Sequence, residues 1–213
     1  MVQVSTLAAV CCFFLSALPV LASPLVALDA ELARRTYTLS EGPIHWKGVV
    51  EEGGEEVQLI GNTFEEIEAQ AKIINPAFAI SNYTTNSTAN VEARDAALAA
   101  RWITHIGCEW PPGWTRTWDF TALHNGIEYL KGLQGWCLHT SGPRTCDRVS
   151  CSWGSAVYWC NDNQGYALVL CAFLGHYAAD IVSQCADQGA NGRTLGQAFD
   201  SGNWNVIVAA GDC

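Results

Sequence analysis

Cysteine content constrains this sequence more than any other feature. Eight of its ten cysteines lie between residues 108 and 213, and an even number in an exported chain indicates four disulfides. The spacing alone does not choose among the many ways of pairing them. No two have the two-residue separation of a zinc knuckle, so we expect no metal and no other cofactor. The expected disulfide residues are Cys108, Cys137, Cys146, Cys151, Cys160, Cys171, Cys185 and Cys213.

The N-terminus predicts export. Residues 7–18 are apolar, but they are fewer than the roughly 20 residues that a membrane-spanning helix needs. The apolar run is followed by a possible cleavage site after Ala22, with small side chains at the third position and at the last position before the cut. Residues 1–22 are therefore predicted to be a signal peptide, and its removal would leave a secreted, extracellular protein with no integral membrane segment.

A second cleavage is predicted at a dibasic pair. Arg34 and Arg35 resemble the sites cut by the kexin family of processing proteases, although a chance doublet is the alternative. Cleavage there would release residues 23–35 as a propeptide, and the mature chain would begin at Thr36.

Two glycosylation acceptors stand close together. Asn82 and Asn86 each begin an N-x-S/T motif within a polar stretch. In an exported chain we expect both asparagines to carry glycans.

The charge of the chain excludes some partners. Its formal net charge is −10, which disfavours nucleic acid and anionic membrane surfaces because both require neutralisation by Lys and Arg. Hydrophobic residues make up 49% of the sequence, which is enough to build a core. The expected partner is an extracellular protein or glycan.

Residues 36–104 form an acidic segment without cysteine. Residues 57–60 are predicted to be a strand, and Thr63 with Glu66 forms a capping box that opens a helix ending near Asn75. A second helix is predicted over residues 91–104. Two interpretations remain open: an accessory or pro-region, and half of a domain that packs on the rest.

Residues 105–213 are predicted to be a cysteine-rich α+β domain. Apolar spacing predicts two helices, and alternation predicts a short strand and two hairpins. The predicted fold is a disulfide-rich two-layer sandwich, an antiparallel sheet with two helices on one face. The helices span residues 119–133 and 166–188, the strand 136–140, and the hairpins 147–162 and 193–209.

Catalytic motifs are missing from the sequence. It contains neither the HExxH of zinc proteases nor the GxSxG of serine hydrolases. The spacing of Glu109, Asp119 and Glu128 does not select a glycosidase pair, so we interpret them as solvated carboxylates. We therefore predict a protein that is not an enzyme.

Nine tryptophans are unusual for 213 residues. Trp110, Trp114 and Trp118 lie in one loop around Pro111 and Pro112. Exposed aromatic rings can stack on sugars or anchor protein partners, whereas buried ones fill a core. For Trp110 and Trp114 both interpretations stay open, and the three together are the candidate binding residues.

A family resemblance lies in the cysteine-rich part. Residues 146–162, followed by Cys171, Cys185 and residues 196–208, resemble a set of small secreted cysteine-rich proteins of filamentous ascomycetes. The order of elements over residues 136–213 is also similar to killer-toxin-like and necrosis-inducing effector domains. The resemblance implies a disulfide-rich α/β sandwich and a non-enzymatic role in host or competitor interaction, and it assigns no functional residue.

We therefore expect a secreted fungal effector-like or killer-toxin-like protein that acts by binding a host or competitor target. A secreted protein that binds cell-wall carbohydrate is one alternative, and a small secreted hydrolase is another.

Overall fold

The computed structural model describes residues 37–40, 42–81, 102–187 and 191–213. The signal peptide, the cleavage sites at Ala22, Arg34 and Arg35, and the acceptors Asn82 and Asn86 lie outside the described residues. Most of the helix predicted over residues 91–104 lies outside them as well.

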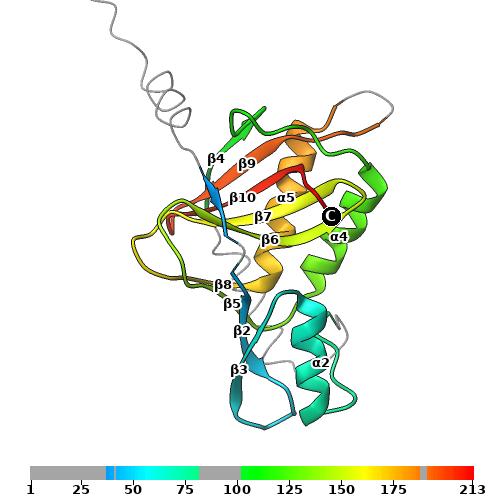
Figure 1. The fold of residues 1–213 in the computed structure, drawn as a ribbon, viewed down its shortest axis with the longest axis vertical. Coiled ribbons are helices and arrows are strands. Elements are labelled where there is room, and N and C mark those ends of the chain that lie inside the picture. The colour runs from blue at the N-terminus through cyan, green and yellow to red at the C-terminus, as the bar shows by residue number, and fades with distance from the viewer. Residues whose placement is uncertain (1–36, 41, 82–101, 188–190) are drawn as a thin grey trace, which may run out of the picture.

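The larger layer is a six-stranded sheet with the order β1-β6-β7-β10-β9-β4. Neighbouring strands are antiparallel except β1, which pairs parallel with β6. The β6–β7 and β9–β10 hairpins form its centre, as predicted from alternation (Figure 1). Its strands are β1 (Thr38–Leu39), β4 (Ile103–Cys108), β6 (Thr145–Ser152), β7 (Ser155–Asn161), β9 (Gly196–Asp200) and β10 (Trp204–Ala210).

Two helices cover one face of this sheet (Figure 1). Helix α4 spans Phe120–Gly132, and the Asp119 carboxylate accepts a hydrogen bond from the Ala122 amide as its N-cap. Helix α5 spans Cys171–Cys185 and buries the face that carries both of its cysteines. Val157 and Val206 from the sheet pack into the same core.

A second, four-stranded sheet has the order β3-β2-β5-β8. Strands β2 (Ile44–Val49) and β3 (Glu56–Gly61) come from the cysteine-free segment, whereas β5 (Trp136–His139) and β8 (Ala167–Leu170) come from the cysteine-rich part. The pairing of β2 with β5 joins the two parts in one sheet. Trp46, on β2, is 1% exposed and shares the core with α4 and α5.

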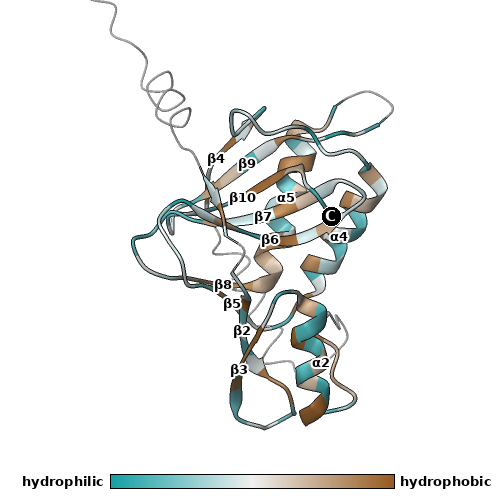
Figure 2. Cartoon of the chain, viewed as in Figure 1, coloured by the Kyte–Doolittle hydropathy of each residue, from teal (hydrophilic) through white to brown (hydrophobic). Residues whose placement is uncertain are grey.

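Helix α2 (Phe64–Ile74) packs beside β3. The predicted cap is present, since Thr63 accepts a hydrogen bond from the Glu66 amide. The Glu66 carboxylate reaches back to the Asn62 amide, one residue before the position expected in a capping box. Figure 2 shows a hydrophobic last turn, where Ile73 is 85% exposed.

The eight cysteines form four disulfides: Cys108–Cys185, Cys137–Cys171, Cys146–Cys160 and Cys151–Cys213. The first two join the ends of α5 to strands β4 and β5. The third crosses the β6–β7 hairpin. The fourth ties the C-terminal residue to β6.

The prediction of a disulfide-rich α+β fold is confirmed. The helix predicted in the cysteine-free segment is present as α2, and the structure adds a second sheet. Two boundaries were wrong. Residues 167–170, predicted to begin the long helix, form β8, because alternate side chains are buried while the backbone pairs with β5. Residues 103–104, predicted to end a helix, belong to β4 and pair through its backbone with β9.

Candidate functional site: an aromatic groove

The six-stranded sheet buries side chains on both faces. Along β7, Val157 and Trp159 point toward the helices, whereas Ala156, Tyr158 and Cys160 belong to a separate cluster on the opposite face. No helix covers that opposite face among the described residues. The loop of residues 109–118, which carries the three predicted tryptophans, covers part of it instead.

Trp114 attaches this loop to the sheet. Its ring packs edge-on against the ring of Tyr158, with centroids 4.9 Å apart and planes at 89°. The Tyr158 hydroxyl donates to the Ala210 carbonyl oxygen at 3.2 Å, and burial raises the pKa of this tyrosine. Trp114 is therefore a half-buried ring held by a second ring with a fixed orientation.

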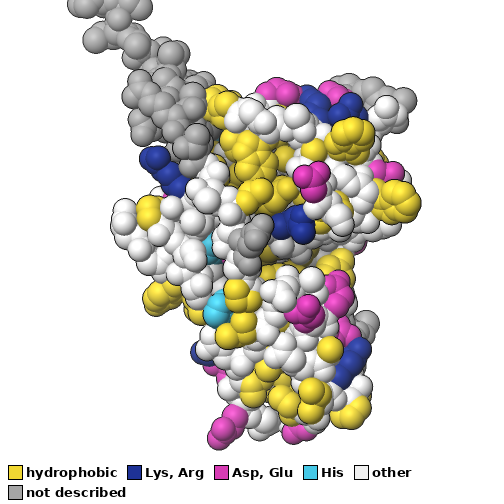
Figure 3. All heavy atoms as spheres, viewed as in Figure 1, with side chains coloured by type: hydrophobic (Ala, Val, Ile, Leu, Met, Phe, Trp, Pro, Cys, Tyr) yellow, Lys and Arg dark blue, Asp and Glu magenta, His cyan; other side chains and the backbone are white. Residues whose placement is uncertain are grey.

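A groove of about 840 Å³ lies beside this pair. Its rim and walls come from β1, the loop of residues 109–118, β6, β7 and the C-terminal residues. The residues that define it here are Leu39, Trp114, Trp118, Arg148, Tyr158 and Asp212, and we refer to it as the aromatic groove. Figure 3 shows hydrophobic side chains gathered on this face of the molecule, over β6, β7 and β10.

Trp118 is the most exposed ring of the groove, at 71%. The Ser155 hydroxyl oxygen accepts hydrogen bonds from the amides of Trp118 and Asp119, so the backbone beneath the ring is held in place. The ring lies over Gly154, where an added Cβ would come within 3.1 Å of it. Gly154 also has a φ of 70°, which favours glycine at this hairpin turn.

Hydrogen bonds hold the rest of the loop against the sheet. The Ala210 amide donates to the Thr115 carbonyl oxygen at 2.8 Å, and the Thr117 amide donates to the Thr194 carbonyl oxygen at 2.9 Å. The Arg116 guanidinium forms ion pairs with Glu109 and Asp187. The aromatic side chains therefore project from a backbone whose conformation is fixed without a ligand.

The C-terminus forms one wall of the groove. The Cys151–Cys213 disulfide fixes the last residue, and the Arg148 guanidinium donates to the Asp212 carbonyl oxygen. A smaller depression of about 230 Å³ shares Ile44, Asn62 and Arg148 with the groove. Residues from the cysteine-free segment thus contribute to this surface.

The structure brings together two of the three predicted tryptophans. Trp114 and Trp118 both line the groove, where Trp114 is half-buried and Trp118 is mostly exposed. Trp110 is not part of the groove lining. It packs over Gly107 on β4, where an added Cβ would lie 3.1 Å from its ring.

The three acidic residues considered for catalysis each have a structural partner. Glu109 pairs with Arg116, Asp119 caps α4, and Glu128 pairs with Lys131 at 2.8 Å. The hydrogen bond from Lys131 lowers the pKa of Glu128. In the part of the chain that the structure describes, no three His, Cys, Asp or Glu side chains are grouped to hold a metal ion, and no helix is long and apolar enough to cross a membrane.

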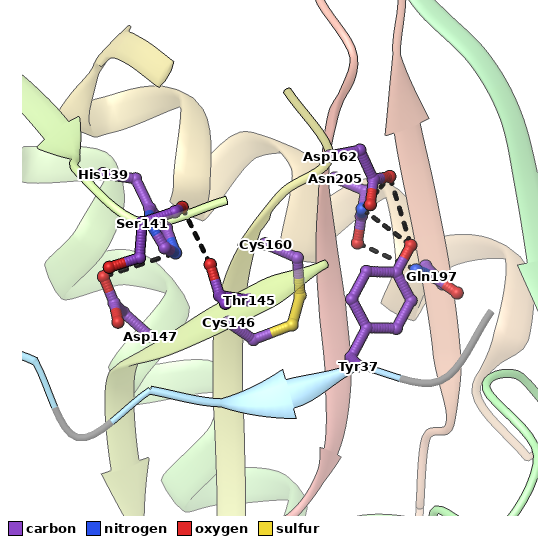
Figure 4. Close-up of a disulfide and its surroundings, with 10 residues drawn as sticks. All are labelled: Tyr37, His139, Ser141, Thr145, Cys146, Asp147, Cys160, Asp162, Gln197 and Asn205. Carbon is purple, nitrogen blue, oxygen red and sulfur yellow. Dashed lines mark hydrogen bonds and ion pairs between the residues drawn. A yellow bond between two sulfur atoms is a disulfide. The ribbon is translucent and has the colours of Figure 1, made fainter. Parts of the chain in front are cut away.

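Two polar clusters flank the Cys146–Cys160 disulfide (Figure 4). In the first, Tyr37 donates to the Asp162 carboxylate at 3.2 Å and accepts from the buried Asn205 amide at 3.0 Å. The Asn205 side chain also accepts from Gln197 at 2.8 Å. This cluster fixes the residue that precedes β1, and no sequence pattern predicts it.

The second cluster contains a buried acid and base. His139 and Asp147 are 1% and 6% exposed, and their nearest side-chain atoms, Nε2 and Oδ2, are 3.4 Å apart. Burial raises the pKa of Asp147 to about 6 and lowers the pKa of His139 to about 4. Both shifts favour the uncharged form of the side chain.

No family model matches this chain, and no curated protein sequence or solved structure shows significant similarity to it. The four disulfides fit an extracellular protein.

Proposed function

We propose that this chain is a secreted, effector-like or toxin-like protein that acts on a host or competitor by binding, and that the aromatic groove is its binding site. One observation carries the proposal: Trp118 is held 71% exposed at the rim of a concave surface by hydrogen bonds to its backbone. Trp102 and Trp153 are similarly exposed, but Trp118 shares a concave surface with the ring of Trp114. Tryptophans in pockets contribute much of the binding energy of many interfaces.

The cross-links support an extracellular role. A disulfide typically adds about 2–4 kcal/mol to stability, mainly by restricting the unfolded chain. The Cys151–Cys213 bond and the anchored loop also fix two walls of the groove before any ligand arrives. A preorganised site loses less conformational entropy on binding. The sequence resemblance to secreted cysteine-rich effector and toxin domains agrees with this proposal.

A comparison of two tryptophan variants tests the site. The secreted, oxidised protein and its Trp118→Ala variant would be applied over a range of doses to plant leaf tissue and to competing fungi. We expect the variant to need at least about tenfold higher doses, since truncating a tryptophan that contacts the partner commonly costs more than about 1.4 kcal/mol. Circular dichroism and thiol counting would check that the variant is folded and oxidised.

Trp102→Ala is the matched control, because Trp102 is 69% exposed but does not line the groove. It should keep the dose dependence of the unmodified protein. Reduced and alkylated protein should be inactive. Equal potency of the Trp118 and Trp102 variants, or no response of any target to the oxidised protein, would contradict the proposal.

A further inference from the structure

The lining of the groove indicates the chemistry of its ligand. This inference rests on the proposed function and makes it specific. We infer that the aromatic groove binds an uncharged oligosaccharide of the target's surface. Three properties of the lining lead to this ligand class: ring faces, charge balance and shape.

The first property is the combination of rings with polar groups. A sugar ring presents an apolar C–H face that packs on an aromatic ring, and hydroxyl groups at its edges that need hydrogen-bond partners. Trp118 offers an exposed ring, and Trp114 lies in the same groove. The polar residues Asn62 and Thr115 line it as well. The hydroxyl groups of a sugar can form hydrogen bonds with such residues, whereas a wholly apolar ligand cannot.

The second property is charge. Among the described lining residues, Arg148 and Asp212 are the charged ones, and their formal charges cancel. The Arg148 guanidinium already donates to the Asp212 carbonyl oxygen. The whole chain carries a formal charge of −10, which repels acidic polysaccharides, phosphorylated ligands and anionic lipids. A neutral ligand meets no such penalty.

The third property is shape. A volume of about 840 Å³ falls within the range of about 300–1,000 Å³ that is common for sites of small ligands. A stable protein partner would instead cover about 800 Å² on each side, much of it outside a concavity. The groove also has open backbone at Gly113, where an added Cβ would meet nothing within 4 Å, so a ligand can approach closely there.

Tryptophan fluorescence titration tests the inference directly. The oxidised secreted protein would be titrated with neutral oligomers of N-acetylglucosamine and of β-linked glucose, and with oligogalacturonate as an acidic probe. We expect saturable binding of at least one neutral oligomer, with little dependence on salt because no ion pair is formed. Trp118→Ala should weaken it at least about tenfold, whereas Trp102→Ala should leave it unchanged.

The possible results distinguish a failure of the glycan inference from a failure of the proposed function. No saturable binding of any neutral oligomer, equal affinity in both variants, or preference for oligogalacturonate would overturn the glycan inference. If Trp118→Ala still abolished biological activity in that case, the groove would remain the binding site with a protein as its partner. If neutral oligomers bound through Trp118 without any effect on host or competitor, the inference would stand while the effector proposal failed.

Discussion

The two regions of this protein are stabilised by different means. Residues 42–81, which form β2, β3 and α2, contain no cysteine and are held by packing, whereas the region from β4 to the C-terminus contains all four disulfides. The aromatic groove takes its rings from the cross-linked region, and Ile44 and Asn62 from the other region also line it. The disulfides are thus concentrated in the region that supplies the rings of the groove.

Trp46 stabilises the cysteine-free region, whereas disulfides stabilise the rest of the chain. Its indole nitrogen donates to the Gln134 carbonyl oxygen at 2.7 Å, and its ring packs edge-on against Phe78 at 5.8 Å. Gly135 allows this approach, because an added Cβ would lie 2.6 Å from the indole nitrogen and its φ is 76°. One side chain therefore connects both regions through packing and a buried hydrogen bond.

The largest effect should come from the longest cross-link. Replacing both Cys108 and Cys185 by alanine removes a bridge that spans 77 residues. The chain-entropy model predicts a loss of about 4–5 kcal/mol in the free energy of unfolding, measured in urea. The matched control is the Cys146 and Cys160 double variant, which removes a 14-residue loop closure and should cost about 3 kcal/mol. If the Cys146 and Cys160 double variant lost more stability than the Cys108 and Cys185 double variant, chain entropy would not determine the difference between them.

The next effect should come from packing in the other region. Trp46→Ala should lower the free energy of unfolding by about 3–4 kcal/mol, because it empties a core site and leaves the Gln134 carbonyl without its donor. Amide hydrogen exchange should show the loss of protection concentrated in β2, β3 and α2. Uniform loss of protection over α4, α5 and the six-stranded sheet would mean that the regions unfold as one unit, and the contrast between them would fail.

Regular patterns made most of the fold predictable from sequence. The β6–β7 and β9–β10 hairpins follow from alternation, and α2 from its capping residues. Strand β8 was missed because apolar residues at 167 and 171 fit a helical spacing as well as a strand followed by a helix. Pairing with β5, a contact distant in sequence, decides between them.

The candidate site was only half predictable. Trp114 and Trp118 were identified by residue type and local crowding, whereas Tyr158 and Arg148 were not, since they join the groove through contacts far along the chain. One signal was available for Tyr158: every residue of β7 is apolar or small up to Asn161, which indicates a strand covered on both faces. That pattern implies that some segment must cover the outer face, but it does not identify the loop of residues 109–118.

The smallest of these effects concerns the junction between the two regions. His139 lies on β5 in the four-stranded sheet and Asp147 on β6 in the six-stranded sheet, and the Ser40 side chain donates to Asp147. Besides Asp147, the groups facing His139 are His45, the ring of Trp159 and the backbone carbonyls of neighbouring residues. This buried pair connects the two sheets without a covalent bond. The protonation states of His139 and Asp147 should therefore affect the stability of the contact between the sheets.

In the unmodified protein, the contributions of His139 and Asp147 to the pH dependence of stability should nearly cancel, and single substitutions should reveal each of them. Between about pH 4 and 6 the folded protein holds one proton on Asp147, and the unfolded chain holds one on His139, so proton uptake nearly cancels. In His139→Gln the raised pKa of Asp147 remains, and its contribution is lost as the pH rises through 6. Stability should then fall by about 2–3 kcal/mol from pH 4 to 6.5. In Asp147→Asn the lowered pKa of His139 remains, and its contribution is lost as the pH falls through 4.

Stability of Asp147→Asn should therefore rise by a similar amount over the same interval, opposite in sign to His139→Gln. Urea unfolding at pH 4 and 6.5 measures both differences, and the unmodified protein should show a smaller change than either variant. Slopes of the same sign in the two variants would mean that the proton does not move from histidine to aspartate on folding. The contact between the sheets would then not depend on the proton balance of this pair.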